Sequence, residues 1–254
     1  MRFYLGTHLP NWLWDPQFAG VPLFVSRRRL ERRKSLESPP SLVEWALDSG
    51  GFTELSMHGE WKVTPREYVR QVQRYSRSLG RMAWAAPQDW MCEPQILEKT
   101  GKTVVEHQRK TVANLIELRS IAPELPWIPV LQGWSEDDYL RCAEIYDNVN
   151  IPLDREPVVG LGTICRRQGT EEAESIVRRL HSEGLRIHAF GAKTTGLVRY
   201  ADFVTSSDSL AWSFNARKNP PLPGCTHATC SNCPKWALRW RTKLLHRIKR
   251  GDQD

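Results

Sequence analysis

The stretch TPREYVRQVQRYSRSLGRMAWAAPQD, residues 64–89, contains a predicted helix followed at once by a predicted strand. Thr64 suits the N-cap of this helix, a proline occupies its first position, and Gly80 suits the position after its end. The apolar run that follows Gly80 ends in the polar pair Gln88 and Asp89. A helix that leads directly into a strand with a polar end is typical of an α/β protein.

Seven more short apolar runs lie along the chain, separated by helical or irregular stretches. They occupy residues 3–6, 22–26, 44–51, 127–133, 157–163, 186–192 and 202–209. Helical spacing recurs at 102–120, 135–148 and 169–184, and we expect Ser135 and Thr170 to cap two of these helices.

Strands that alternate with helices predict a parallel sheet covered by helices. Eight such strands permit a closed (β/α)8 barrel of the TIM type. The alternative, an open doubly wound sheet, usually carries a glycine-rich phosphate-binding loop after its first strand, and none follows residues 3–6. The sequence therefore favours an α/β fold with a TIM-type barrel.

Length and composition are those of an ordinary globular protein. The chain has 254 residues, of which 40% are hydrophobic and 26% charged, and this length suits a single barrel domain over residues 1–254. No stretch approaches the roughly 18 consecutive apolar residues that a membrane span needs. The first residues, MRFYLGTHLPNWLWD, lack the long apolar region of a signal peptide. We therefore expect a cytoplasmic protein without a membrane partner.

The charge balance points to an anionic partner. The net charge is +7, and much of the excess lies in SRRRLERRK at 26–34 and RWRTKLLHRIKR at 239–250. Clustered arginines suit nucleic acid, because each neutralised phosphate releases counterions. A solvated basic surface without a partner is the open alternative. The residues expected to contact nucleic acid are Arg27, Arg28, Arg29, Arg32, Arg33 and Arg217.

Five of the predicted strands end in segments that are polar or rich in glycine. They are Asp48-Ser49-Gly50-Gly51, Gln88-Asp89, Gln132-Gly133, Gly160-Leu161-Gly162 and Ser207-Asp208-Ser209. In a barrel these strand ends converge on one face, where chemistry is located. A single aspartate at a strand end is more often a turn former or a helix cap, but three carboxylates and an amide on one rim indicate a site.

The same motifs carry a resemblance to a known family. The order DSGGF, QG after an apolar strand, GLG, SSDSLAWS and a C-terminal cysteine cluster resembles the queuine and archaeosine tRNA-guanine transglycosylases. PQDWMCEP and HQRKTVAN make the chain more similar to their shorter relatives, the deazapurine DNA-modification proteins of the DpdA family. The resemblance covers about residues 44–241.

The resemblance implies base exchange at a glycosidic bond, in which guanine leaves and a 7-deazaguanine enters. It assigns Asp208 as the nucleophile that attacks C1′ and Asp48 as the acid/base. Asp202 is a rival nucleophile, but it precedes its predicted strand and would lie at the opposite end of the barrel.

The resemblance also implies how the base is recognised. Asp89 and Gln132 would recognise the purine edge, and Ser49 would contact base or sugar. Backbone at Gly50, Gly51, Gly133, Gly160, Leu161 and Gly162 would complete the pocket, with His107 and Arg109 as supporting residues.

Three functions follow, two of them enzymatic and one of a different class. The first is a DNA-guanine transglycosylase that inserts a 7-deazaguanine base, with 7-cyano-7-deazaguanine as the expected base, and it requires the target base to leave the duplex. The second is a tRNA-guanine transglycosylase, and the third a non-catalytic zinc-containing protein that binds nucleic acid. A homodimer and a helicase or ATPase partner stay open.

The segment CTHATCSNC predicts a metal centre. Cys225, His227, Cys230 and Cys233 form the pattern C-x-H-x2-C-x2-C, and three thiolates with one imidazole suit a structural Zn²⁺ ion. We expect a zinc-binding subdomain at about 222–250. His246 is the alternative fourth ligand, but a straight helix would place it roughly 20 Å along the axis from Cys233.

Overall fold

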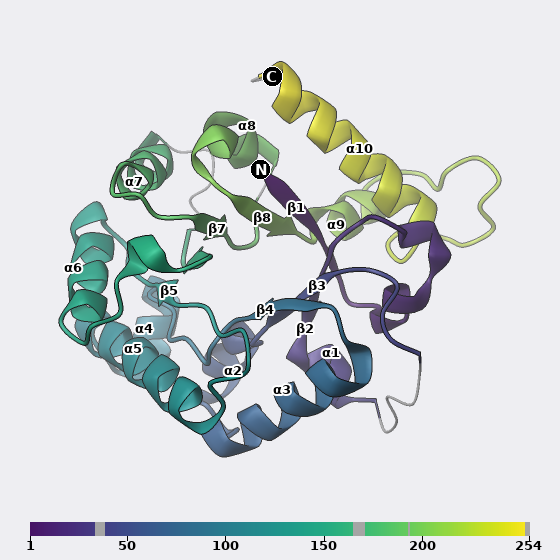
Figure 1. The fold of residues 1–254 in the computed structure, drawn as a ribbon. Helices are drawn as coiled ribbons and strands as arrows, with labels where there is room; N and C mark the ends of the chain where they lie inside the picture. The colour runs from purple at the N-terminus through teal and green to yellow at the C-terminus, as the bar shows by residue number, and fades with distance from the viewer. Residues whose placement is uncertain (34–38, 165–170, 193, 252–254) are drawn as a thin grey trace.

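The computed structural model describes residues 1–33, 39–164, 171–192 and 194–251 (Figure 1). Lys34 of the basic stretch, the cysteine at 165 and the predicted cap Thr170 lie outside these ranges.

Eight parallel strands form one curled sheet, with the order β4-β3-β2-β1-β8-β7-β6-β5. Consecutive strands along the chain are neighbours, apart from β4 and β5 at the two edges, and β1 pairs with β8, which is the arrangement of a TIM-type barrel. The predicted fold class is therefore confirmed. The strands are β1 (Arg2–Thr7), β2 (Leu23–Ser26), β3 (Trp45–Asp48), β4 (Met82–Ala85), β5 (Val130–Leu131), β6 (Val159–Leu161), β7 (Ile187–Ala189) and β8 (Ser206–Ser209).

The sheet closes between β4 and the segment that leads into β5. A single parallel bridge joins Ala85 to Trp127 at this point. The amide of Ala85 donates to the Pro126 carbonyl at 2.9 Å, and the amide of Ile128 donates to the Ala85 carbonyl at 3.2 Å. This contact, the barrel seam, is short because β5 itself has only two residues.

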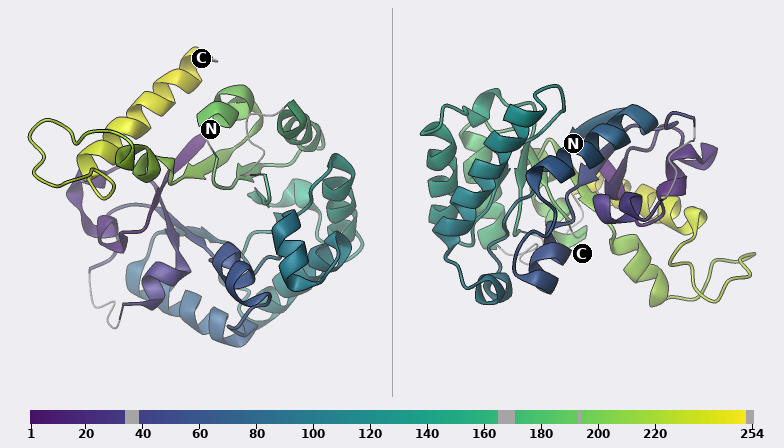
Figure 2. Two further views of the ribbon diagram at one scale, coloured as in Figure 1. Left: turned by 180° about the vertical axis from the view of Figure 1, so that it is seen from behind. Right: turned by 90° about the horizontal axis from the view of Figure 1, so that it is seen from below.

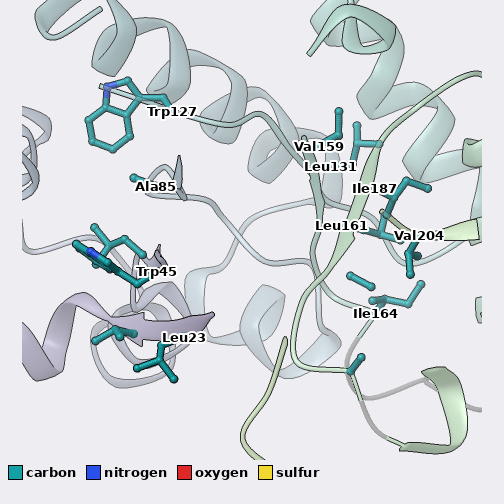
Figure 3. Packing of buried hydrophobic residues seen from close by; sticks show 14 of the residues in the cluster. Leu23, Trp45, Ala85, Trp127, Leu131, Val159, Leu161, Ile164, Ile187 and Val204 are labelled. Atoms are coloured by element: carbon teal, nitrogen blue, oxygen red, sulfur yellow. The ribbon is translucent and has the colours of Figure 1, made fainter. Parts of the chain in front are cut away.

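Two separate cores follow from the alternation of side chains along each strand. The larger core lies between the sheet and the surrounding helices and includes Leu23, Trp45, Leu131 and Ile187 (Figure 3). The smaller core fills the barrel lumen with Tyr4, Phe24, Ala46, Trp84, Ala86 and Ile128. The lumen is thus packed at depth, and any cavity has to lie above it, at a barrel end.

The helices of the described ranges surround this sheet. They are α1 (Arg27–Glu31), α2 (Gly51–His58), α3 (Pro65–Leu79), α4 (Pro94–Thr100), α5 (Val104–Ile121), α6 (Glu136–Asp147), α7 (Glu171–Ser182), α8 (Thr194–Tyr200), α9 (Ala211–Arg217) and α10 (Pro234–Arg250). Short 3-10 helices occur at Pro10–Trp14, Pro16–Phe18, Leu153–Arg155 and Ala201–Phe203.

The predicted helix caps at Thr64 and Ser135 are confirmed. Each side chain accepts a hydrogen bond from the backbone three residues on, and Glu67 or Asp138 returns it in a capping box. Thr103 caps α5 in the same way. These caps fix where each helix leaves its strand.

The short helices α1, α2 and α4 occupy segments for which the sequence predicted no helix. The basic stretch at 26–33 contains α1, the glycine pair leads into α2 at Gly51, and α4 follows Glu93. Each has eight residues or fewer, so its apolar spacing is too brief to distinguish it from a loop.

The C-terminal part lies outside the ring of strands. Helix α10 packs beside α8 and α9, and the loop between α9 and α10 projects away from the barrel (Figure 2). The predicted division, one domain with a zinc-binding subdomain at about 222–250, stays a prediction. Among the described helices, none is long and apolar enough to cross a membrane.

Candidate active site

A cavity of about 360 Å³ opens at the carboxyl ends of the strands. Three aspartates from separate strands line it: Asp48 ends β3, Asp89 follows β4, and Asp208 lies in β8. Ser49, Gly50, Gln132 and Gly162 line it as well. The structure thus brings most of the sequence-predicted site residues together in one cavity.

The glycine pair shapes the loop that carries Asp48. Gly50 has a φ of 82°, in the left-handed region that favours glycine, and its amide donates to Asp48 Oδ1 at 3.1 Å. At Gly51 a Cβ atom would lie 3.2 Å from Asp89 Oδ1, close to the ring of Trp61 and the tip of Met91. The two glycines therefore allow the turn and bring α2 close to the Asp89 carboxylate.

Asp48 has the electrostatic environment of a proton donor. Burial raises its pKa above the ordinary value, and the nearby negative charge of Asp208 adds to the rise. Hydrogen bonds from the Gly50 amide and the Ser26 side chain oppose it. A carboxyl group held in this way keeps its proton to a higher pH than an exposed aspartate does.

Asp89 is the centre of a polar network at the cavity wall. Ser49 Oγ donates to Asp89 Oδ1 at 3.0 Å, and Gln132 Nε2 donates to Oδ2 at 2.6 Å. Thr163 Oγ1 donates to Gln132 Oε1 at 2.5 Å and accepts from the Cys92 amide. These contacts fix the rotamers of the acid and the amide.

The pKa of Asp89 rises to about 7. Burial is the main cause and the charge of Asp48 adds to it, whereas the hydrogen bonds from Ser49 and Gln132 oppose the shift. Asp89 therefore changes its charge near neutral pH, inside the cavity.

The predicted glycines in and after β5 and β6 mainly make room for neighbouring side chains. A Cβ at Gly162 would lie 2.3 Å from Gln132 Nε2, and one at Gly160 would lie 2.5 Å from the Phe190 ring. Gly133 packs against α6, where a Cβ would meet Asp138 at 2.8 Å. Leu161 belongs to the outer core. Of these four, only Gly162 lines the cavity.

Asp208 lies in β8 and is 4% exposed. Its Oδ1 accepts from the Gly191 amide at 2.8 Å and lies 3.3 Å from His188 Nε2. The rival Asp202 lies in the 3-10 helix before β8, in a hollow shared with Met1 and the end of α10. Met1 precedes β1, so Asp202 is at the opposite end of the barrel from the cavity.

Several residues that line the cavity were not among the predicted site residues. Phe24, Phe52, Thr53, Ala86, Met91, Glu93, Thr163, Phe190 and Gly191 line the cavity. Phe190 and Gly191 follow β7, and the sequence HAFGA at the end of a predicted strand was the available signal for them. Thr163 has a φ of 60°, a conformation that the sequence does not reveal for a threonine.

His107 and Arg109 lie on α5 away from the cavity lining. His107 is buried, and its ring nitrogens lie 2.6 Å from the Met91 carbonyl and 2.8 Å from Thr100 Oγ1. It therefore holds the loop after β4 against α4. Arg109 is exposed.

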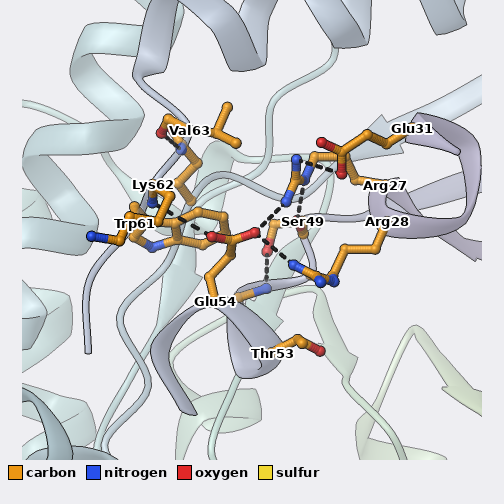
Figure 4. Close-up of polar contacts among 12 residues, drawn as sticks. Arg27, Arg28, Glu31, Ser49, Thr53, Glu54, Trp61, Lys62 and Val63 are labelled. Carbon is orange, nitrogen blue, oxygen red and sulfur yellow. Dashed lines mark hydrogen bonds and ion pairs between the residues drawn. The ribbon is translucent and has the colours of Figure 1, made fainter. Parts of the chain in front are cut away.

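Arg27 is fully buried and contacts protein rather than solvent (Figure 4). Its Nη2 pairs with Glu54 at 2.6 Å, its Nη1 with the Glu31 carboxylate at 3.2 Å, and its Nε donates to the Ser49 carbonyl at 3.1 Å. Arg28 also pairs with Glu54, at 2.8 Å. Arg27 therefore has no access to a phosphate, and it ties α1 and α2 to the loop that carries Asp48.

The other predicted arginines have different exposures. Arg29, Arg32 and Arg217 are exposed, and Arg28 is 26% exposed. Arg33 lies over the Trp14 ring, 5.1 Å from its centroid. Helix α1 follows β2 and α9 follows β8, so these two groups of arginines start from the same barrel end as the cavity.

The C-terminal cluster brings four potential metal ligands together. The donor atoms of Cys225, His227, Cys230 and Cys233 all lie within 4.8 Å of one another. His227 Nε2 is 3.0 Å from Cys230 Sγ, which also accepts from the Leu222 amide at 3.3 Å. His246 lies near the far end of α10, in the hollow with Met1. A set of three thiols and one imidazole can hold a metal ion.

The fold and the cavity define an α/β-barrel protein with a carboxylate-rich candidate active site at the carboxyl ends of its strands and a separate candidate metal centre. The family model of DpdA, DeoxyPurine in DNA protein A, matches residues 1–253, and the chain belongs to this family. The resemblance inferred from the motifs is thereby confirmed. A comparison with curated proteins gave no match.

Membership in this family implies a role in deazapurine modification of DNA. It also makes DNA the expected substrate and associates the chain with an enzyme of nucleic-acid modification.

Proposed function

We propose that the protein is a DNA-guanine transglycosylase, which exchanges guanine for a 7-deazaguanine base through a covalent glycosyl-aspartate intermediate. The expected base is 7-cyano-7-deazaguanine. The observation that carries the proposal is the convergence of Asp48, Asp89 and Asp208 on one cavity at the carboxyl ends of the strands. A cavity of about 360 Å³ is within the usual range for small-ligand sites.

In the first half-reaction Asp208 attacks C1′ of the target deoxyguanosine. A bond forms between a carboxylate oxygen and C1′, the C1′–N9 bond breaks, and its electron pair leaves with the base. Asp48 supplies the proton that the departing guanine needs, and its raised pKa supports this role.

In the second half-reaction the incoming base takes the place of guanine. Its N9–H proton passes to Asp48, N9 attacks C1′, and the carbon–oxygen bond to Asp208 breaks. Both carboxyl groups return to their starting protonation states, so the exchange is balanced and needs no oxidant.

Asp89 and Gln132 are assigned to recognition of the base edge. An ionised Asp89 can accept hydrogen bonds from the N1–H and exocyclic amine of a guanine-like base. The amide of Gln132 has two N–H groups, and only one is used toward Asp89, so the other can donate to the base carbonyl. Phe24 and Phe190 line the cavity as well, and their rings offer an apolar surface to a flat heterocycle.

The target base has to leave the duplex stack to reach this cavity. The positive charge of the chain favours the DNA backbone, and Arg28, Arg29, Arg32, Arg33 and Arg217 are the proposed contacts. A homodimer and a helicase or ATPase partner stay open.

The Cys225, His227, Cys230 and Cys233 cluster is proposed to hold one structural Zn²⁺ ion. The donor set fits zinc because soft thiolates and an imidazole prefer this ion in tetrahedral sites. The ion would tie the loop after α9 to the start of α10, at a distance from the chemistry.

The test measures exchange of labelled guanine into duplex DNA, single-stranded DNA and bulk tRNA. We expect incorporation into DNA with the wild-type protein and a loss of more than about 1,000-fold in Asp208→Asn, because the amide cannot form the ester. Denaturing gels should show a protein–DNA adduct with the wild-type protein only.

Asp202→Asn is the matched control, since it changes the rival aspartate at the other barrel end and should retain exchange. Incorporation into tRNA alone would transfer the proposal to the tRNA enzymes. Wild-type exchange by Asp208→Asn would remove the nucleophile assignment, and no exchange into any nucleic acid would favour the non-catalytic alternative.

A further inference from the structure

His188 is a buried polar residue that the proposed reaction leaves unexplained. It lies in β7, is 0% exposed, and points into the barrel lumen, while its neighbours Ile187 and Ala189 join the outer core. Most of its neighbours in the lumen are apolar or aromatic, and a polar side chain there costs stability unless it is hydrogen-bonded.

Four aromatic rings surround the imidazole. The ring centroids of Trp84 and Phe190 lie 4.6 and 4.8 Å away, and those of Phe24 and Tyr4 lie 5.8 and 5.9 Å away. Such packing holds the ring in one place and excludes water from it.

The imidazole connects two residues of β8. Its Nδ1 lies 2.8 Å from Ser206 Oγ, and its Nε2 lies 3.3 Å from Asp208 Oδ1. The Asp208 carboxylate that acts as nucleophile in the proposed reaction can only accept, so Nε2 carries the hydrogen, and Nδ1 shares a hydrogen bond with the Ser206 hydroxyl. The pair His188 and Ser206 lies opposite in the β7–β8 register, which makes the first contact a property of the sheet.

The chain of hydrogen bonds ends at the cavity with the carboxylate, not with the serine. Asp208 lines the cavity, whereas Ser206, two residues earlier on the same face of β8, lies deeper and is 3% exposed. This order differs from a hydrolytic triad, in which the serine faces the substrate. The reactive group here is the carboxylate.

Both hydrogen bonds recorded for the Asp208 carboxylate within the described ranges fall on Oδ1. They come from the Gly191 amide and from His188 Nε2. The two donors fix the rotation of the carboxylate, so that Oδ2 is the oxygen available to C1′. After ester formation Oδ1 becomes the carbonyl oxygen of the ester, and both donors keep their hydrogens.

We propose that His188, held by Ser206 and the four aromatic rings, is the positioning residue that orients Asp208 for attack. The inference rests on the proposed function, because it assigns Asp208 as the nucleophile. His188 acts only through Asp208, so its loss should affect the chemical step and not the binding of the base.

The kinetic test compares His188→Leu, His188→Asn and His188→Gln in guanine exchange. His188→Leu should lower kcat by about 100-fold and leave KM for the base within about twofold. Gln can present an N–H near the position of Nε2, so it should recover about tenfold of that loss, while Asn, which is shorter, should not. His181→Leu, an exposed histidine on α7, is the control and should match the wild-type protein.

A rise in KM without a fall in kcat, or an equal loss in all three variants, would overturn the positioning role. If the wild-type protein forms an adduct with DNA and His188→Leu forms it equally fast, the inference fails while the proposed function stands.

A second measurement does not depend on activity. Nitrogen-15 NMR of the histidine rings should show hydrogen on His188 Nε2, and its signals should shift in Asp208→Ala. A ring without hydrogen on Nε2, or no shift in Asp208→Ala, would contradict the inference even if no exchange is found. Absence of exchange by the wild-type protein would count against the proposed function alone.

Discussion

Asp89 is almost completely buried, yet it is a carboxyl group whose pKa of about 7 keeps it poised between charged and neutral forms. The folded protein binds its proton more tightly than the unfolded chain does, where an aspartate has a pKa of about 4. Stability therefore falls as the pH rises from about 4 to about 7, because ionisation is harder in the folded state. The site thus has a cost in stability at working pH.

Asp89→Asn should accordingly stabilise the fold at pH 8 by about 1–3 kcal/mol, and the gain should vanish near pH 4. An asparagine can still accept from Gln132 and offer its NH₂ group to the Ser49 hydroxyl. Urea denaturation of both proteins between pH 4 and pH 8 measures the difference. A destabilised variant at pH 8 would show that burial does not dominate the pKa of Asp89.

The same variant should lose binding of the base, which separates stability from function at this residue. In the wild-type protein the affinity for the base should fall below about pH 7, because protonated Asp89 has lost its charge and one of its two good acceptor oxygens, so it cannot accept well from both the N1–H group and the exocyclic amine. Calorimetric titration at pH 6 and pH 8 tests this. Equal affinity at both would remove Asp89 from recognition of the base.

At the scale of elements, α1 and α2 are held together by Glu54. It is 3% exposed and accepts from both Arg27 and Arg28, and Arg27 in turn donates to the loop carrying Asp48 (Figure 4). Two buried charges of opposite sign satisfy each other, but neither is tolerated alone. This ion cluster supports the loop that carries Asp48.

Glu54→Gln should therefore destabilise the protein by about 3 kcal/mol, since it leaves the buried Arg27 guanidinium without its main counter-charge. Glu60→Gln is the matched control: Glu60 pairs with Lys62 at the surface, and its replacement should leave the unfolding midpoint in urea unchanged. Equal midpoints for both variants would contradict the support role.

The elements were predictable wherever their pattern is long or repeated. All eight strands and the helices α3, α5, α6 and α7 follow from apolar spacing and caps. The short helices α1, α2 and α4 do not, because two turns give no clear period. The role of Arg27 was missed for a related reason, as a basic run looks the same whether an arginine faces solvent or a buried glutamate 27 residues away.

The site was predictable to a similar degree. Asp48, Asp89, Gln132 and Asp208 follow from polar residues at strand ends, since a barrel collects those ends on one face. Gly160 and Gly162 were identified, but their role in making room for Phe190 and Gln132 needs three-dimensional packing. His188 lies within a strand, where a lone histidine is indistinguishable from any core residue.

At the scale of the whole molecule, the C-terminal cluster joins the loop after α9 to α10. Cys230→Ala should remove one metal ion per chain and lower the thermal midpoint, because three ligands hold zinc much less tightly than four. His246→Ala should keep the metal ion and the thermal midpoint of the wild-type protein. Elemental analysis of the purified proteins gives the metal content. A metal-free wild-type protein, or a loss of metal in His246→Ala, would contradict the ligand set.

The barrel seam between β4 and β5 also concerns the molecule as a whole. Asp89 follows β4 and Gln132 follows β5, so their 2.6 Å hydrogen bond crosses the seam just above the Ala85–Trp127 bridge. A base bound to both side chains would connect β4 to β5 across the seam, where the sheet has only a single bridge. Amide hydrogen exchange at residues 126–131 should therefore slow when the base binds, because the bound base would make local opening of the seam less frequent.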